Sequence, residues 1–299
     1  MAGEPRVMIC VGATKAGTSW LHDHLSSRAD CHFRTIKELH YFTMTEPRHF
    51  AAARAKLARE RDELAAARAG ADPDRAARLA RRIADLDDWD RVLARGAIDL
   101  AAYRAFLMAG AGGASVVGEV TPAYALMSVA EMKRLAAIGQ DTRILFLMRD
   151  PVARLWSHVR MIAERTTDSV AAFEAAARGL LARILAGDLS GEGKGIVKRG
   201  DYATILGKLW RAFAPAQLLV LFTEDLLNGP GLDRLNDFLG LPPGAARADR
   251  KVHEGRALAL EPEAARAARA WLSPQYDFVQ RHFPALPAAW TRTRAEGLA

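Results

Sequence analysis

The sequence predicts an α/β protein with three layers, α/β/α, in which helices cover both faces of a central parallel sheet. Short apolar runs of strand length alternate along the chain with longer segments of helical periodicity. The first of these runs ends in a glycine-containing loop that leads directly into a helix. Because half of the 299 residues are hydrophobic, the chain can bury a large core, and we expect residues 1–299 to form a single domain.

The loop after the first apolar run, Val7 to Val11, indicates a phosphate site. Glycines let the backbone approach an anion closely, and the free N–H groups at a helix N-terminus point at it. Gly12 and Gly17 have the spacing of the nucleotide triphosphatase P-loop, G-x-x-x-x-G-K-[ST]. Thr18, however, occupies the lysine position, and the lysine, Lys15, lies inside the loop. We therefore expect a P-loop-like fold whose loop binds phosphate without running ATP chemistry.

Four further apolar runs are expected to complete the sheet, at 31–33, 115–120, 143–148 and 218–221. Residues 46 to about 110 have a different composition, rich in Ala, Arg, Asp and Glu and poor in strand formers. Leucine and isoleucine recur there at helical spacing, so we expect a helical insertion of two or three helices. Two roles are open for it, a lid or acceptor wall over the site and a structural hairpin packed on the sheet edge.

Helices are expected to dominate the C-terminal half, at 168–186, 201–213, 222–227, 232–239 and 261–283. Asp201 is a plausible N-cap for the second of these helices. The glycines at 191–195 predict a flexible loop. The final helix carries Trp271, Tyr276 and Phe278, which we expect to be packing residues.

Composition favours an anionic ligand, since the formal net charge is +7 and the sequence pI is near 9.7. No compact Lys/Arg run is present, so we expect no nucleic-acid partner. Cys10 and Cys31 form neither a disulfide framework nor a metal-ligand spacing, and no metal site is expected. The N-terminus lacks a signal-peptide pattern and no apolar stretch has bilayer length, which predicts a cytoplasmic protein without a membrane span. The oligomeric state is not determined by these features.

The glycine loop resembles the 5′-phosphosulfate loop of the sulfotransferases, which use 3′-phosphoadenosine 5′-phosphosulfate (PAPS) as donor and release PAP. The similarity covers the run Lys15-Ala16-Gly17-Thr18-Ser19-Trp20 and implies that Thr14 to Trp20 bind the donor. It also implies that Lys15 is the cation at the leaving phosphate. Trp20 is expected either to contact the adenine or to pack in the core.

A second motif follows the most apolar run, 143–148. The residues Arg149-Asp150-Pro151-Val152-Ala153-Arg154-Leu155-Trp156-Ser157 place a guanidinium at the carboxyl end of a strand, where open α/β sheets bind ligands. The pattern R-D-P-x-x-R-x-x-S resembles the sulfotransferase 3′-phosphate motif and implies that Arg149 and Ser157 hold that phosphate. The alternative is that Arg149 pairs with Asp150. A basic loop near residue 255 resembles a further donor loop more loosely, so Lys251, Gly255 and Arg256 are either donor-binding or simply solvated.

A third motif suggests the catalytic base. Lys37-Glu38-Leu39-His40-Tyr41-Phe42 resembles the K-E-x-H-F-F stretch of the heparan-sulfate type of sulfotransferase, which implies that Glu38 is the base. His40 is the rival, because imidazole suits proton transfer near neutral pH. The alternative role for Glu38 is a loop carboxylate paired with Lys37 or Arg34. The segment Glu119 to Tyr124 resembles E-K-T-P-x-Y of the same group, but Val120 replaces the lysine and implies a different acceptor environment.

Together these motifs predict a sulfotransferase of the heparan-sulfate or bacterial type. It would transfer the sulfuryl group of PAPS to a hydroxyl of an acceptor without a bound metal, and an amine acceptor is the less favoured alternative. The acceptor class is open among glycans, lipids and small metabolites. A nucleotide kinase and a non-catalytic nucleotide-binding module are the alternatives, the former disfavoured by the displaced Lys15.

Overall fold

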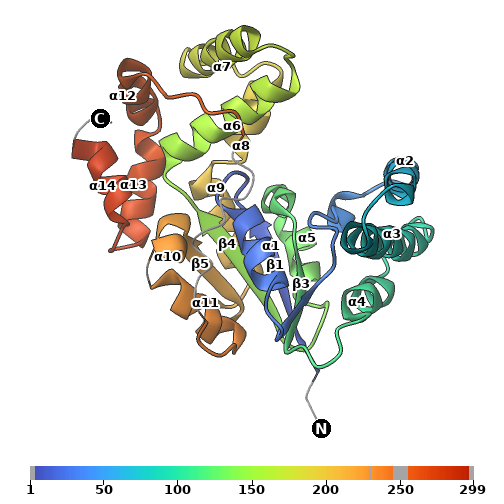
Figure 1. Cartoon of the computed structure of the whole chain (residues 1–299). Helices are drawn as coiled ribbons and strands as arrows, with labels where there is room; N and C mark the ends of the chain where they lie inside the picture. Colours follow the sequence, from blue (N-terminus) through green and yellow to red (C-terminus); the bar gives the residue numbers. More distant parts are fainter. Residues whose placement is uncertain (1–3, 229, 245–254, 296–299) are drawn as a thin grey trace.

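The computed structural model describes residues 4–228, 230–244 and 255–295. Five strands form one parallel sheet in the order β2-β3-β1-β4-β5 (Figure 1). Their bounds are Arg6–Gly12 for β1, Cys31–Phe33 for β2, Val116–Val120 for β3, Thr142–Met148 for β4 and Leu218–Phe222 for β5. Each of the five predicted apolar runs therefore forms a strand. Residues 144–148 of β4 are fully buried, as expected for a central strand covered on both faces.

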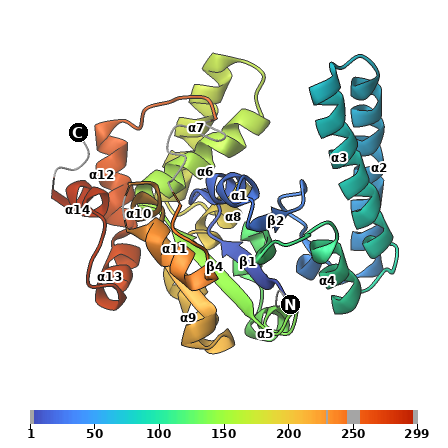
Figure 2. The ribbon, with the colours of Figure 1, turned by 60° about the horizontal axis from the view of Figure 1, so that its bottom comes forward.

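Helices cover both faces of this sheet, which confirms the predicted three-layer, P-loop-like α/β/α fold. Helices α1 (Thr18–Ser26) and α11 (Gly231–Leu239) lie on one face. Helices α5 (Val129–Leu135) and α9 (Tyr202–Ala212) lie on the other (Figures 1 and 2). The side chain of Asp201 caps α9 by accepting a hydrogen bond from the backbone N–H of Thr204, as predicted.

The order of the strands determines where a ligand site can form. β1 lies at the centre, between β3 and β4. After β1 the chain builds β2 and β3 on one side and then crosses to build β4 and β5 on the other, so the strand order switches between β1 and β4. Ligands of open α/β sheets bind outside the carboxyl ends of the strands at such a switch point. The loop after β1 and the start of α6 (Pro151–Arg165), which follows β4, lie at this position.

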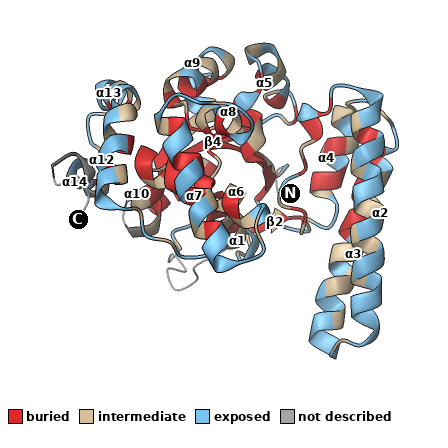
Figure 3. Cartoon of the chain, turned by 90° about the horizontal axis from the view of Figure 1, so that it is seen from above, coloured by how far each residue is buried: buried red, intermediate tan, exposed pale blue. Residues whose placement is uncertain are grey.

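The segment assigned to the helical insertion contains α2 (Pro47–Ala69), α3 (Pro73–Leu93) and α4 (Leu100–Met108). Phe50 is the buried residue of α2, whereas α3 buries a set of residues in its C-terminal half: Asp85, Leu86, Trp89, Val92 and Leu93. The long antiparallel pair α2–α3 extends beside the rest of the chain (Figure 2), and much of its surface is exposed (Figure 3). Only one end of this pair therefore contributes to the core.

Two predictions for the C-terminal half were wrong. Residues 191–195 were expected to form a flexible loop, but Glu192–Lys198 form helix α8, in which Gly193 is buried because it packs closely on Ile184 of α7 (Val170–Leu185). The predicted single helix at 261–283 is divided into α12 (Pro262–Trp271) and α13 (Ser273–His282). Pro274 lies in the first turn of α13, where it cannot donate the backbone hydrogen bond that would continue α12.

The remaining elements are short. They are α10 (Thr223–Asn228), α14 (Ala288–Ala295) and the 3₁₀ turns η1 (Tyr41–Thr43), η2 (Pro122–Leu126) and η3 (Pro215–Gln217). Two of them adjoin the carboxyl edge of the sheet, because α10 directly follows β5 and η2 begins two residues after β3. Among the residues that the structure describes, no helix combines the length and apolar character needed to cross a membrane.

Candidate active site

The loop between β1 and α1 is the candidate anion-binding site and is called the cradle below. Gly17 has φ +79° and is the N-cap of α1, and a Cβ at this position would lie 2.8 Å from Thr223 Cγ2. Glycine is therefore required both for the backbone conformation and for the close approach. The predicted loop residues from Thr14 to Trp20 enter α1 in the way that phosphate-binding loops do, with the first-turn N–H groups at the open end of the helix.

Thr223 connects this cradle to the neighbouring strand, a role that sequence reasoning missed. Its buried hydroxyl lies 2.7 Å from the carbonyl oxygen of Ala16 and 3.0 Å from that of Met148. The hydroxyl can donate to either carbonyl, so it links the tip of the loop to the last residue of β4. The available sequence signal was a hydroxyl residue immediately after an apolar run, at the carboxyl edge of the sheet.

Positive charge is concentrated around the cradle. The guanidinium of Arg149 donates to the carbonyl oxygen of Lys15 at 3.4 Å. Burial lowers the pKa of Lys15, and the positive charges of Arg149, Arg160, Arg165 and Lys37 lower it further. Within the described ranges, no carboxylate lies at ion-pair distance from Lys15 or Arg149. The Lys15 and Arg149 pair, with positive charge around it, suits a ligand that carries several negative charges.

The backbone at the start of α6 holds Arg149 in place. The hydroxyl of Tyr202 donates to the Arg149 carbonyl at 2.7 Å and lies 3.1 Å from its N–H. Asp150 caps α6 by accepting from the N–H of Ala153, and it accepts a second hydrogen bond from Tyr276 Oη at 2.6 Å. The Asp150 carboxylate thus accepts hydrogen bonds from α6 and α13. It does not form the ion pair with Arg149 that was the alternative prediction.

The serine and second arginine of this motif lie in different environments. Ser157 is half-buried on α6, two turns after Arg149. The side chain of Arg154 is only 2% exposed and donates to the Ile196 carbonyl at 3.2 Å. Burial and the charges of neighbouring cations lower the pKa of the adjacent His158 to about 3, so this imidazole is neutral. Arg154 therefore has a packing role, and Arg149 and Ser157 remain the candidate anion ligands.

The other predicted donor residues are placed as follows. Gly255 and Arg256 run along α6, where the carbonyl of Arg256 accepts from Arg160 at 2.9 Å and its guanidinium lies 3.8 Å from Glu164. Lys251 lies outside the described residues. Trp20 is buried at 8% exposure, and its ring stacks on that of His24 at 4.9 Å. The packing role predicted for Trp20 is therefore present in the structure.

The candidate base lies beside the cradle. Lys37 Nζ is 2.9 Å from Glu38 Oε1 and 3.5 Å from Thr18 Oγ1, so Lys37 connects the carboxylate to the first residue of α1. His40, with φ 55°, places its Nε2 3.4 Å from the other carboxylate oxygen of Glu38. Burial raises the pKa of Glu38, but hydrogen bonds from His40 and Lys37 outweigh it and lower that pKa to about 2. The structure therefore brings Lys37, Glu38 and His40 together, with Glu38 ionised.

No cluster of three or more His, Cys, Asp or Glu side chains with the arrangement of a metal site is present among the described residues. Cys10 and Cys31 are buried thiols without a disulfide bond. Burial raises the pKa of both thiols to about 12. These cysteines are accordingly components of the core.

A profile of the sulfotransferase family matches residues 5–243. Over 125 residues the chain is 31% identical to two Mus musculus proteins, heparan sulfate glucosamine 3-O-sulfotransferases 3B1 and 3A1. These alignments cover 41% of this chain and 30% of each mouse protein, so the chain matches less than a third of their length.

Two solved structures share the fold. The sulfotransferase from Alicyclobacillus acidocaldarius has a TM-score of 0.60 at 20% identity, covering 97% of this chain and 100% of its own. The sulfotransferase domain from the curacin biosynthetic pathway has a TM-score of 0.50 at 16% identity, covering 81% of this chain and 76% of its own. At such identities the likeness concerns the fold alone.

Fold and site define a P-loop-like α/β protein with a polyanion cradle next to an ionised carboxylate. The match across residues 5–243 then identifies the class: the chain belongs to the sulfotransferase family.

Thr223→Val is expected to weaken PAP binding about fivefold. Valine keeps the shape but removes the hydroxyl between Ala16 and Met148, and one such hydrogen bond contributes about 1 kcal/mol. Titration calorimetry with PAP measures the effect. Thr166→Val is the control, because the Thr166 hydroxyl bonds only carbonyls at the C-terminal end of α6. Unchanged affinity in a folded Thr223→Val variant would show that the loop does not depend on this link.

Proposed function

We propose that the protein transfers the sulfuryl group of PAPS to a hydroxyl of an acceptor and releases PAP. The observation that carries the proposal is the position of Lys37, whose Nζ lies between the cradle residue Thr18 and the carboxylate of Glu38. This position supports a donor site and a base that lie close together at the sheet edge. Transfer of a sulfuryl group between two oxygens needs both within reach of one sulfur atom.

The donor half of the proposal rests on charge. PAPS carries a 5′-phosphosulfate and a 3′-phosphate, which require positive charge at two places. The cradle with Lys15 suits the first, and the pair Arg149 and Ser157, reached from the next strand, suits the second. The concentration of cations that lowers the pKa of Lys15 supports this fit, because a bound polyanion would relieve their mutual repulsion.

The acceptor half rests on Glu38. In the proposed step the acceptor oxygen forms a bond to sulfur while the bond from sulfur to the bridging oxygen breaks, and the electron pair of that bond leaves with PAP. Glu38 takes the proton that the acceptor hydroxyl loses. Lys15 and the loop N–H groups stabilise the charge that develops on the bridging oxygen. In this step, residues of this chain accept the proton and stabilise the developing negative charge.

The acceptor is proposed to be an alcohol, and its class is open among glycans, lipids and small metabolites. The names of the two mouse relatives specify a hydroxyl, the 3-O position of glucosamine, which supports O-sulfation. Val120 is fully buried on β3, so the lysine expected there from the resemblance has no counterpart at this position. An acceptor that needs no cation at that point is therefore favoured.

The donor proposal predicts tight binding of PAP without magnesium and much weaker binding of ATP. Arg149→Ala should weaken PAP binding about 10-fold to 100-fold, the equivalent of about 1.5–3 kcal/mol for a charged hydrogen bond. Calorimetry with PAP, with ATP and with EDTA present measures both effects.

Arg143→Ala is the matched control, because Arg143 lies at the opposite end of β4 and pairs with Asp141. Magnesium-dependent ATP binding tighter than PAP binding would contradict the donor proposal. Equal PAP affinity in wild type and Arg149→Ala would contradict the assignment of the 3′-phosphate.

Glu38→Gln is expected to lower kcat by roughly a hundredfold or more while PAP affinity stays unchanged. Glutamine keeps the shape but cannot accept the proton. Glu46→Gln, which alters an exposed glutamate paired with Arg48, is the control. A wild-type rate in Glu38→Gln together with an inactive but folded His40→Ala would make His40 the base.

The pH profile separates the same two candidates. Because the pKa of Glu38 is lowered to about 2, its carboxylate stays ionised as the pH falls through the range in which an ordinary histidine gains a proton. With Glu38 as base, kcat/KM should stay constant from about pH 7.5 down to about pH 5. Loss of activity near pH 6.5 would instead indicate an imidazole base.

An acceptor panel tests the reaction itself. Labelled PAPS is incubated with a sulfated polysaccharide, a desulfated polysaccharide, a sterol, a phenol and a short aliphatic alcohol, and transferred label is measured for each. Transfer to at least one hydroxyl compound that is abolished in Glu38→Gln is the expected result. Transfer by the Glu38→Gln variant equal to that of the wild type would contradict Glu38 as base.

A further inference from the structure

The loop that carries the candidate base has almost no secondary structure of its own. Residues 34–40 connect β2 to η1 and include Lys37, Glu38 and His40. One backbone hydrogen bond, from the N–H of Val120 to the Lys37 carbonyl at 3.3 Å, joins the loop to the sheet. Such a segment adopts many conformations unless side chains from other elements hold it. The position of Glu38 therefore depends on the contacts at the two ends of the loop.

A buried carboxylate holds the C-terminal end of the loop. Glu119 Oε2 on β3 accepts from the backbone N–H of Leu39 at 3.2 Å, and Thr121 Oγ1 lies 3.0 Å from the same N–H. Glu119 is only 2% exposed, and its other oxygen accepts from Tyr103 and Tyr124. This contact comes from the central sheet and fixes the backbone one residue after Glu38.

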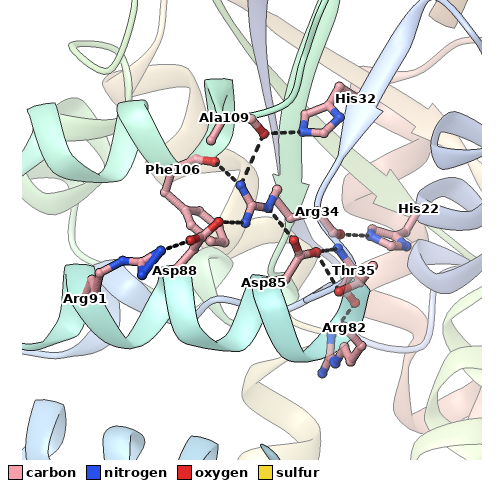
Figure 4. Close-up of polar contacts among 10 residues, drawn as sticks. All are labelled: His22, His32, Arg34, Thr35, Arg82, Asp85, Asp88, Arg91, Phe106 and Ala109. Carbon is pink, nitrogen blue, oxygen red and sulfur yellow. Dashed lines mark hydrogen bonds and ion pairs between the residues drawn. The ribbon is translucent and has the colours of Figure 1, made fainter. Parts of the chain in front are cut away.

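A second carboxylate holds the N-terminal end, and it comes from α3. Asp85 Oδ2 accepts from the backbone N–H and the hydroxyl of Thr35, both at 2.6 Å, and Asp85 Oδ1 accepts from Arg34 Nε at 2.8 Å (Figure 4). Arg82, one turn earlier on α3, donates to the Thr35 carbonyl. The N–H and carbonyl of Thr35, together with its hydroxyl, are thus all bound by α3, three residues before Glu38.

This second contact is buried and well satisfied. Asp85 is 7% exposed and Arg34 is 6% exposed. Arg34 also pairs with Asp88, donates to the carbonyls of Phe106 and Ala109, and lies 4.4 Å above the ring of Phe106 (Figure 4). Buried charged hydrogen bonds of this kind rigidify the groups that they join. The loop is consequently held between a carboxylate of the sheet and a carboxylate of α3.

We propose that Asp85 is a positioning residue for sulfuryl transfer, which fixes the loop from α3 and so holds Glu38 next to Lys37, whose Nζ reaches Thr18. The proposal rests on the proposed role of Glu38 as base. It gives the contact face of α3 at Arg82 and Asp85 a supporting role at the site. It also assigns a function to a carboxylate that lies 47 positions away from Glu38 in the sequence.

Asp85→Asn is the primary test. An amide keeps the shape of the side chain, but its NH₂ group cannot accept a hydrogen bond. At least one of the hydrogen bonds from Arg34 or Thr35 to Asp85 is therefore lost. With the best acceptor from the panel, kcat should fall at least tenfold, whereas PAP affinity should change less than twofold. Hydrogen exchange of the peptide covering residues 34–43 should become faster.

Asp90→Asn is the matched control. Asp90 lies on the same helix but pairs with Arg54 of α2, at 2.8 and 3.1 Å, and makes no contact with the loop. It should leave kcat, PAP affinity and hydrogen exchange of residues 34–43 unchanged. Should Asp85→Asn fail to fold, the double variant Arg34→Met/Asp85→Leu replaces the buried pair with apolar groups, which proteins often tolerate. It still removes the acceptor for Thr35.

Combination with Glu38→Gln separates positioning from general damage. If Asp85 acts through Glu38, then Asp85→Asn should lower kcat no further in the Glu38→Gln background. The proposal would be overturned if Asp85→Asn lowered kcat by the same factor in the Glu38→Gln background as in the wild type. Wild-type kcat and unchanged hydrogen exchange in the single variant Asp85→Asn would also overturn it. Absence of transfer by the wild type to every acceptor would overturn the proposed function instead, and the exchange measurement would still report whether Asp85 holds the loop.

Discussion

The structure depends on holding several positive charges together at the carboxyl edge of one sheet. Lys15 and Arg149 approach from adjacent strands, and no described carboxylate pairs with either of them. Because the two positive charges repel each other, the backbone that carries them has to be held in place. Thr223 links the loop to β4, and Tyr202 binds both polar groups of the Arg149 backbone. Neutral hydroxyls serve this purpose well, because they fix the geometry without cancelling the charge that a polyanion would meet.

The candidate base, Glu38, lies in the opposite kind of environment, because its side chain is close to positively charged or proton-donating groups. Around Glu38, cationic or proton-donating partners are close, and carboxylates hold the backbone on both sides. Glu119 and Asp85 act from β3 and α3 and contact the loop through backbone N–H groups rather than through the Glu38 side chain. Burial raises the pKa of Glu119, while hydrogen bonds from Thr121, Tyr103 and Tyr124 oppose that shift. The structural carboxylates Glu119 and Asp85 are therefore separate from the candidate base, Glu38.

These two arrangements meet at the N-terminus of α1. Thr18 belongs to the cradle, and Lys37 reaches it from the base loop. Any movement of the loop would alter the distance between the carboxylate and the phosphate site. Helix α3 of the α2–α3 pair helps to fix this distance, because Asp85 and Arg82 bind the backbone of the loop. Most of the surface of the pair nevertheless faces solvent. A segment whose composition differs from the rest of the chain is thus tied into the site through a few buried polar contacts.

The sequence by itself determined the strands, the glycine loop after the first strand and the family resemblance. These features are local, because an apolar run and a loop motif each occupy consecutive residues. Each can therefore be recognised without knowing which other parts of the chain pack against it. The catalytic roles of Lys15 and Glu38 and the donor contacts of Arg149 and Ser157 stay predictions from that resemblance. Helix ends were less predictable, since the division at Leu272 and the formation of α8 depend on Pro274 and on how closely Gly193 packs.

Only the tertiary structure decided which distant residues support the site. Thr223, Glu119 and Asp85 lie on different elements, and each contacts a loop that is far away in sequence. Arg154 shows the converse, because it lies within the motif but is turned into the core to bind the Ile196 carbonyl. The physical reason is the same in each case. Burial and hydrogen-bond geometry are set by the packing of elements against one another, and this packing is not encoded in the spacing of residues along any one of them.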